Sequence, residues 1–199
     1  SQISGDKVWI AGLADNNIVP EGYSGATALG VAAENGMAGI YDKFTWMDAF
    51  LGNIPGSIGE TSIIAIGIGL IILLATKVAS WRIVLWTFIG MIAMSSLLNI
   101  VGSDTNPMFE VPWYWHAVIG SFAFGLVFMA TEPVSGSGTN TGRCIYGFII
   151  GITVILIRVI NPAFPEGMML AILFANLLAP VIDHMVMMSN INRRKALAQ

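Results

Sequence analysis

An all-α integral membrane protein with about five transmembrane helices is the fold class that the sequence predicts. Hydrophobic residues make up 55% of its 199 positions and charged residues only 11%, whereas soluble domains carry about 25% charged residues. Together with a mean hydropathy of +0.75, this composition cannot cover a surface that faces water. Apolar runs of the roughly 20 residues that a bilayer requires recur along the chain after a first stretch that contains none.

We place the predicted helices by these apolar runs. They cover Ile58–Thr76, Trp81–Val101, Tyr114–Thr131, Cys144–Ile160 and Gly167–Met188. The chain then divides into a loop region over residues 1–57, a membrane domain over residues 58–191 and a basic tail over residues 192–199. Glycine-broken helix starts are typical of half of an inverted-repeat, channel-like fold. Because the sequence begins with Ser, we expect a processed chain or the C-terminal part of a longer one.

The lysines and arginines predict the orientation, since basic loops stay on the cytoplasmic side of a membrane. When five spans are counted back from the tail, six of the nine basic residues fall on one side: Lys77, Arg82, Arg143, Arg193, Arg194 and Lys195. We therefore expect the tail in the cytoplasm. Residues 1–57 and the loop over residues 102–113 then face the outer, periplasmic side.

Composition and charge also exclude several functions. The formal net charge of −3 comes without a basic patch, which argues against a nucleic-acid partner. The single cysteine, Cys144, excludes a disulfide framework and a cysteine-ligated iron–sulfur cluster within this chain. His116 and His184 fall near opposite faces, so they cannot share a ligand site. The glycine-rich stretch over residues 135–142 follows a membrane helix rather than a strand, so we interpret it as a cytoplasmic linker.

A short run of small residues near the start of the chain carries the first candidate site. The segment Ser24-Gly25-Ala26-Thr27 predicts a flexible loop that exposes the hydroxyl of Thr27. Such a loop can enter the active site of a modifying enzyme, and the hydroxyl can take a phosphoester. A plain glycine turn explains the same four residues.

Glu60 is a second candidate, because it opens the first predicted span. Ser57 and Glu60 have the S-x-x-E spacing of a capping box, which alone explains the glutamate. The alternative is a broken-helix site, in which Gly52, Gly56 and Gly59 let the backbone approach a cofactor edge or form a re-entrant turn.

Oxygen-bearing side chains near the inner end of the last span predict a sodium path. Asn176, Pro180 and Asp183 share one helical face, and Pro180 deprives the Asn176 carbonyl of its helical donor. The resulting carbonyl, amide and carboxylate are hard oxygen ligands that suit Na⁺, and Glu132 adds a carboxylate at the inner end of the third span. A carboxylate that reaches the interface explains Asp183 as well, and a solvated helix end explains Glu132. We interpret Arg158 as reaching the lipid headgroups, with a cofactor phosphate or a carboxylate as the alternative partner.

Five segments together carry a family resemblance. They are S-G-A-T at 24–27, T-W-M-D-A-F-L-G-N-I-P-G-S-I-G-E-T-S at 45–62, G-S-D-T-N-P-M-F at 102–109, A-T-E-P-V-S at 130–135 and R-V-I-N-P-A-F-P-E-G-M-M-L at 158–170. The chain resembles the B-subunit family of the bacterial sodium-translocating NADH:quinone oxidoreductases, from the S-G-A-T loop to the basic tail. The related Rnf complex shares the S-G-A-T and G-E-T-S elements, whereas the G-S-D-T-N-P-M-F loop points to the quinone reductase.

The resemblance implies a cofactor and partners. A flavin transferase attaches FMN covalently to Thr27 through a phosphoester on the outer face. Electrons pass from other subunits of the complex toward ubiquinone while Na⁺ is exported across the bacterial inner membrane, and NADH is oxidised on another subunit. Family acids at the positions of Glu132 and Asp183 are implicated in sodium uptake, although the family often has Asp where this chain has Glu132.

The family's subunit is about twice as long as this chain, so the resemblance implies a C-terminal half. Riboflavin and parts of the quinone site are then expected partly on the upstream half. A channel or transporter half without a redox role fits the predicted spans equally well, and an Rnf-type homologue is a further alternative. Only the S-G-A-T loop and the family segments separate these functions.

Overall fold

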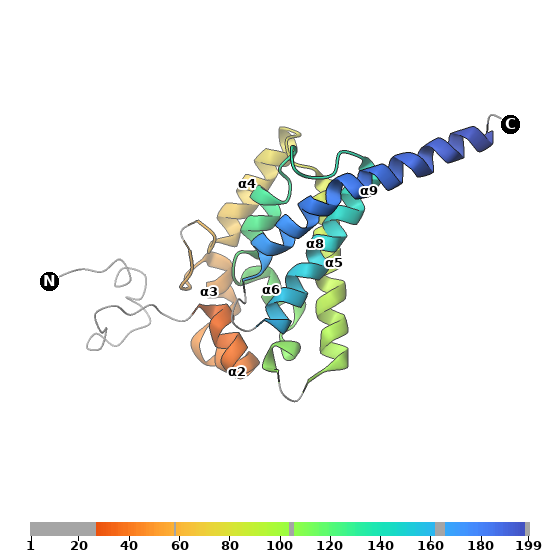
Figure 1. Cartoon of the computed structure of the whole chain (residues 1–199). Coiled ribbons are helices and arrows are strands. Elements are labelled where there is room, and N and C mark those ends of the chain that lie inside the picture. The colour runs from red at the N-terminus through yellow and green to blue at the C-terminus, as the bar shows by residue number, and fades with distance from the viewer. Residues whose placement is uncertain (1–26, 58, 104–105, 162–165, 198–199) are drawn as a thin grey trace.

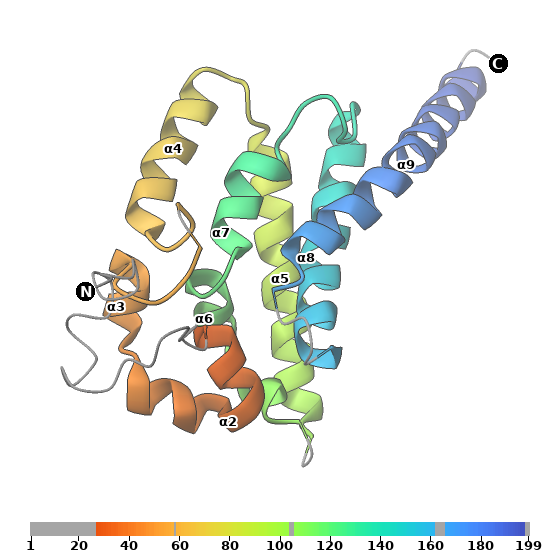
Figure 2. The same cartoon turned by 60° about the vertical axis from the view of Figure 1, so that its left-hand side comes forward.

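The computed structural model describes residues 27–57, 59–103, 106–161 and 166–197, and the regular elements in these ranges are all helices. Three of them are long and apolar enough to cross a membrane: α5 (Trp81–Val101), α8 (Asn140–Ile160) and α9 (Met168–Leu197). Figures 1 and 2 show α8 packed between α5 and α9. The predicted all-α membrane fold is confirmed.

Small residues bring α5 and α8 together. A Cβ atom on Gly151 would lie 2.2 Å from the carbonyl oxygen of Thr87, and one on Gly147 would lie 2.8 Å from that of Ile83. Membrane helices associate through such close backbone approach, because lipid tails provide no hydrophobic force between them. The glycines of α8 therefore fix the central helix pair of the bundle.

The predicted span over Tyr114–Thr131 is wrong as one continuous helix. The structure has α6 (Trp113–Val118), an interruption at Ile119–Ser121, and then α7 (Phe122–Phe124), which continues into the π-helical turn η2 (Gly125–Met129). Gly120 has a φ of +67°, a conformation that a helix cannot contain and that side-chain-bearing residues rarely adopt. Hydropathy cannot register such an interruption, because the residues around it are apolar.

The first predicted span is shorter than expected. Helix α4 covers Ile63–Ala75 and begins after Ser62, whose hydroxyl accepts a hydrogen bond from the Ala65 N–H at 3.4 Å. At 13 residues and a rise of about 1.5 Å per residue, α4 is too short to cross the roughly 30 Å hydrocarbon core.

Residues 1–57 were predicted to be a loop region, and for the described part this is wrong. Helix α2 covers Ala28–Lys43, with a kink at Gly36, and α3 covers Trp46–Leu51. Helix α2 packs against the 3₁₀ helix η1 (Pro107–Glu110) and buries Leu29, Val31 and Ile40. These helices are too short and too polar to appear as spans in a hydropathy reading.

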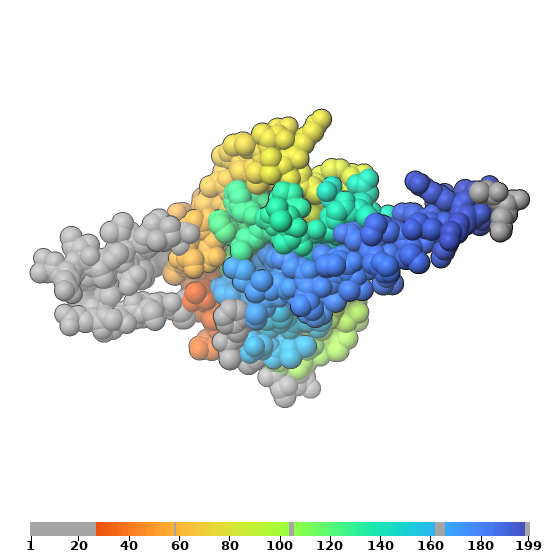
Figure 3. Space-filling model, turned by 45° about the horizontal axis from the view of Figure 1, so that its top comes forward, coloured from red at the N-terminus to blue at the C-terminus, as the bar shows by residue number. Residues whose placement is uncertain are grey.

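Helix α9 continues to Leu197 and thus through most of the predicted basic tail. Figures 1 and 3 show its C-terminal part extending beyond the rest of the molecule. Figure 2 places α2 at the opposite end of the bundle from this extension and from the loop that precedes α8. The candidate residues therefore form two sites, one at each end.

Candidate functional site

Thr27 is exposed and caps the N-terminus of α2. Its Oγ1 accepts a hydrogen bond from the Gly30 N–H at 3.2 Å, and its carbonyl accepts one from the Val31 N–H at 3.0 Å. The predicted attachment residues Ser24, Gly25 and Ala26 lie outside the described residues. The hydroxyl of Thr27 is thus held at a helix start, which is a favourable place for a negatively charged group.

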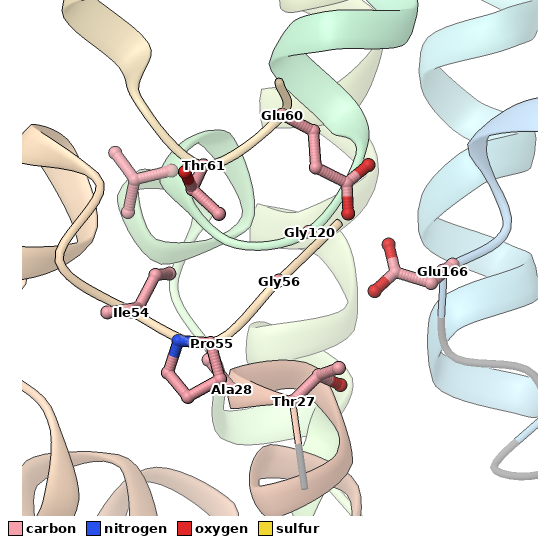
Figure 4. Close-up of a pocket in the computed structure, with 10 residues that line it drawn as sticks. Thr27, Ala28, Ile54, Pro55, Gly56, Glu60, Thr61, Gly120 and Glu166 are labelled. Carbon is pink, nitrogen blue, oxygen red and sulfur yellow. The ribbon is translucent and has the colours of Figure 1, made fainter. Parts of the chain in front are cut away.

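A pocket opens beside this hydroxyl, and residues from several separate segments form it (Figure 4). Its lining consists of Thr27, Ala28, Ile54, Pro55, Gly56, Glu60, Thr61, Val118, Gly120 and Glu166. The start of α2, the segment before α4 and the break between α6 and α7 therefore meet at one place. Sequence reasoning had singled out Thr27 and Glu60 separately, and the structure brings them to the same pocket.

Glu60 belongs to a turn that ends before α4 begins. Its N–H donates to the Ser57 carbonyl at 3.3 Å, and its Oε1 accepts from the Ser57 N–H at 3.1 Å. Half of the predicted capping box thus exists, because the Glu60 side chain meets the Ser57 N–H, while the Glu60 N–H goes to the Ser57 carbonyl and not to its hydroxyl. The helix itself is capped by Ser62. A contact between Glu60 and a cofactor stays a prediction.

Arg158 is fully buried, so the expectation that it reaches the lipid headgroups is wrong. Its guanidinium donates to the carbonyls of His116 at 2.8 Å and Ile119 at 3.2 Å, and its Nε donates to the carbonyl of Glu166 at 3.3 Å. The first two carbonyls belong to the end of α6, where no further helical turn supplies donors. Arg158 therefore replaces the hydrogen bonds that the helix break removes.

Glu166 provides the hydrogen-bond acceptor for the backbone that follows the same helix break. Its Oε2 accepts hydrogen bonds from the N–H of Ser121 at 2.9 Å and from the Ser121 hydroxyl at 3.0 Å. Sequence reasoning missed Glu166 and the role of Arg158. The available signal was an arginine and a glutamate that flank Asn161-Pro162 in an otherwise apolar stretch.

At the other end of the bundle, Asp183 holds the loop before α8. One of its oxygens accepts from the hydroxyls of Ser137 and Thr139, both at 2.6 Å, and from the Thr139 N–H at 3.1 Å. The other accepts from the Gly138 N–H at 2.8 Å. The carboxylate is thus surrounded by donors in this conformation.

Glu132 holds the beginning of that same loop. It accepts hydrogen bonds from the Val134 N–H at 3.0 Å and from the N–H and hydroxyl of Ser135 at 2.8 and 2.5 Å. The Ser135 hydroxyl, followed by these backbone donors, lowers the pKa of Glu132 from its ordinary value. The two acids predicted for sodium therefore act on the two ends of one loop.

Asn176 is engaged separately, because its Oδ1 accepts from the hydroxyl of Tyr146. Within the described ranges, no three His, Cys, Asp or Glu residues gather closely enough to hold a metal ion. The structure does not bring Asp183, Glu132 and Asn176 into one oxygen cluster, and their role toward sodium stays a prediction.

Comparison with known proteins gives the family. A model of the NQR2, RnfD, RnfE family matches residues 1–192. This chain belongs to that family. It is 58% identical over 194 residues to the B subunit of the Na(+)-translocating NADH-quinone reductase of Chromohalobacter salexigens, covering 98% of this chain and 45% of that protein. It is also 59% identical over 197 residues to the protein of the same name from Ectopseudomonas mendocina, covering 98% and 47%.

These comparisons confirm the family resemblance that the sequence segments carry. The chain spans about half the length of the curated relatives that it matches. Together with the three long apolar helices, membership of the family indicates a multi-pass membrane protein.

Proposed function

We propose that this chain is the flavin-carrying part of the B subunit in a redox-driven sodium pump. It passes electrons from partner subunits toward ubiquinone while Na⁺ is exported across the bacterial inner membrane. The names of the relatives support the sodium-translocating NADH-quinone reductase over an Rnf-type complex, although the family model includes both. The observation that carries the flavin assignment is the exposed Thr27, which lines a small pocket beside a helix break.

FMN attachment requires only chemistry that this hydroxyl can provide. A flavin transferase would form a bond between Thr27 Oγ1 and the flavin-bearing phosphorus while the phosphoanhydride bond of the flavin donor breaks. The donor's other phosphate departs as the leaving group, and the hydroxyl proton goes to solvent. The product is a negatively charged phosphodiester at the start of α2. The Gly30 N–H, which now donates to Thr27 Oγ1 at 3.2 Å, can donate to a phosphate oxygen, and the helix dipole favours the added charge.

The enclosed part of the pocket measures about 10 Å³, room for a water molecule, so the flavin would lie along its open side rather than inside it. Gly56 and Gly120 line it, so backbone can approach a flat ring closely. The carboxylates of Glu60 and Glu166 repel a phosphate, which keeps the phosphate at the α2 side. The bound flavin supplies the electron-carrying chemistry, while the chain's own residues position the cofactor.

The sodium path belongs to the same proposal. Asp183 and Glu132 hold one loop at the end of the bundle away from Thr27, and Na⁺ would enter there from the cytoplasm. The Asn176 carbonyl lacks its helical donor because Pro180 has no N–H, so it adds a neutral oxygen. Ubiquinone and riboflavin would bind partly on the upstream half of the subunit.

Three forms of the full complex test the flavin assignment: wild type and two variants. Thr27→Asn keeps a good helix cap but offers no hydroxyl for a phosphoester, whereas Thr27→Ser keeps both. The measurement is ultraviolet fluorescence of the denatured polypeptide in a gel. We expect fluorescence from wild type and from Thr27→Ser and none from Thr27→Asn. A fluorescent Thr27→Asn chain would move the attachment elsewhere, and a dark wild-type chain would favour a channel without a redox role.

A further inference from the structure

The break between α6 and α7 would be unfavourable in a membrane protein without hydrogen-bond partners from other parts of the chain. A helix that stops leaves carbonyls without donors, and a helix that starts leaves N–H groups without acceptors. Lipid cannot satisfy them, so other protein groups must. Here the guanidinium of Arg158 satisfies the carbonyls of His116 and Ile119, and the carboxylate of Glu166 satisfies the N–H of Ser121. We call these two side chains the Arg158–Glu166 clamp.

The clamp is a connected unit rather than two separate contacts. Arg158 Nε donates to the main-chain carbonyl of Glu166 at 3.3 Å, so each residue helps to place the other. Both approach Gly120 closely. A Cβ atom on that glycine would lie 2.6 Å from Glu166 Oε2 and 3.2 Å from Arg158 Nη2. The clamp therefore fixes the backbone of the break itself.

Gly120 also links the clamp to the start of α2. The same Cβ atom would lie only 2.3 Å from Cδ1 of Leu29. Leu29 is fully buried and lies two residues after Thr27 in the first turn of α2. A chain of direct contacts thus runs from the clamp through Gly120 and Leu29 to the turn that carries the Thr27 hydroxyl.

Stability of the bundle alone does not explain the clamp. Removing a charged side chain from water is strongly unfavourable, whereas a continuous helix satisfies its own backbone without any charge. A continuous helix would, however, remove the wall that Val118 and Gly120 contribute beside Thr27. Because the break lies at this pocket, holding the break also holds the shape of the pocket.

We propose that Arg158 and Glu166 are positioning residues for the flavin on Thr27. They hold the break at Gly120 in the conformation that shapes the pocket and places the first turn of α2. This inference rests on the proposed function and adds two residues: Arg158, which does not line the pocket, and Glu166, which does.

The test uses the full complex in its native membrane and measures covalent flavin per assembled chain. Arg158→Met keeps length and apolar packing but has no donors, and Arg158→Lys restores the charge with fewer directions of hydrogen bonding. Glu166→Gln keeps an acceptor for Ser121 and loses the charge. Thr87→Val, a near-isosteric change of a buried residue at the α5–α8 contact, is the matched control.

We expect at least about a tenfold loss of flavin per chain in Arg158→Met, because the variant loses all three hydrogen bonds of the guanidinium and a single charge-assisted bond already corresponds to about tenfold. Glu166→Gln should lose roughly threefold and Arg158→Lys should recover part of the loss. The Thr87→Val control should match wild type, because a merely structural defect lowers the yield of complex and not the flavin on each assembled chain.

Wild-type flavin on assembled Arg158→Met chains would overturn the inference. If that variant does not assemble, Glu166→Gln decides, and its having the wild-type flavin content would overturn the inference equally. Failure of the proposed function looks different, because then the wild-type chain is dark or Thr27→Asn stays fluorescent. If Thr27→Asn chains lack fluorescence while Arg158→Met chains have the wild-type fluorescence, the role of the clamp is rejected and the flavin assignment stands.

Discussion

Replacing Asp183 by Asn separates a sodium ligand from a loop anchor. The carboxylate accepts four hydrogen bonds, from Ser137, Gly138 and twice from Thr139. In Asp183→Asn, one oxygen becomes an NH₂ group that faces a donor, so at least one of these bonds is lost. A hydrogen bond to a charged group contributes about 1.5–3 kcal/mol, and partial exposure to solvent places the loss at the lower end of that range.

The loss of the Asp183 charge sets a lower bound on the increase in the sodium concentration that half-maximal turnover requires. Two unit charges 4 Å apart attract each other by about 1 kcal/mol even in bulk water, and a bound Na⁺ would lie closer to its ligand. Removing the charge should therefore raise the sodium concentration for half-maximal turnover by at least about fivefold. The assay is quinone reduction by the full complex against sodium concentration, with the flavin content of each variant measured in parallel.

Ser137→Ala is the matched control for this experiment. It removes one donor from Asp183, whose hydrogen bond is 2.6 Å long, but leaves the charge and frees an acceptor site. If Asp183 is a sodium ligand, Ser137→Ala should leave the sodium concentration for half-maximal turnover unchanged or lower it, while Asp183→Asn should raise it. Equal shifts in both variants, or no shift in Asp183→Asn, would refute the ligand role and leave Asp183 as the anchor of the loop before α8.

Four further predictions concern other parts of the chain. Glu132→Ala should raise the sodium requirement less than Asp183→Asn does. Ser135 holds the pKa of Glu132 below its ordinary value of 4.5. The charged carboxylate therefore stabilises the loop fully above pH 4.5, and this stabilisation is lost as the pH falls through the lowered pKa of the folded chain. Protection of the loop from hydrogen exchange should weaken only in that acidic range. Gly151→Leu should abolish assembly, since even its Cβ would lie 2.2 Å from a backbone oxygen of α5; normal complex yield would contradict this packing. An impermeant thiol reagent on intact cells should label Asp104→Cys and not Ala198→Cys, and the reverse pattern would invert the topology.

The long helices could be predicted from the sequence because hydropathy is a property of local composition. The predicted span at Trp81–Val101 has the same bounds as α5, α8 contains the run Cys144–Ile160, and α9 contains all but the first residue of the run Gly167–Met188. Thr27 could also be selected from the sequence, through a motif and a resemblance. No tertiary contact is needed for either inference, since length, apolarity and residue order contain the information.

The pocket itself could not be predicted in this way. Its walls come from the start of α2, the segment before α4, the break at Gly120 and Glu166, which are far apart in the chain. Helix α2 lacks an apolar run of span length, and its buried residues pack against η1 and beside Gly120. Only the folded chain shows which separate segments meet.

Arg158 shows most clearly what local sequence reasoning determines and what tertiary structure decides. Its type and its place at the end of an apolar run were known from the sequence, and a charged residue there ordinarily extends to the interface. Its burial became favourable because the break at Gly120 presents the carbonyls of His116 and Ile119 to it. A charge can be buried only where partners are already arranged. The sequence by itself therefore determined the membrane fold and the flavin candidate, while the tertiary structure decided which charges stay buried and where the site forms.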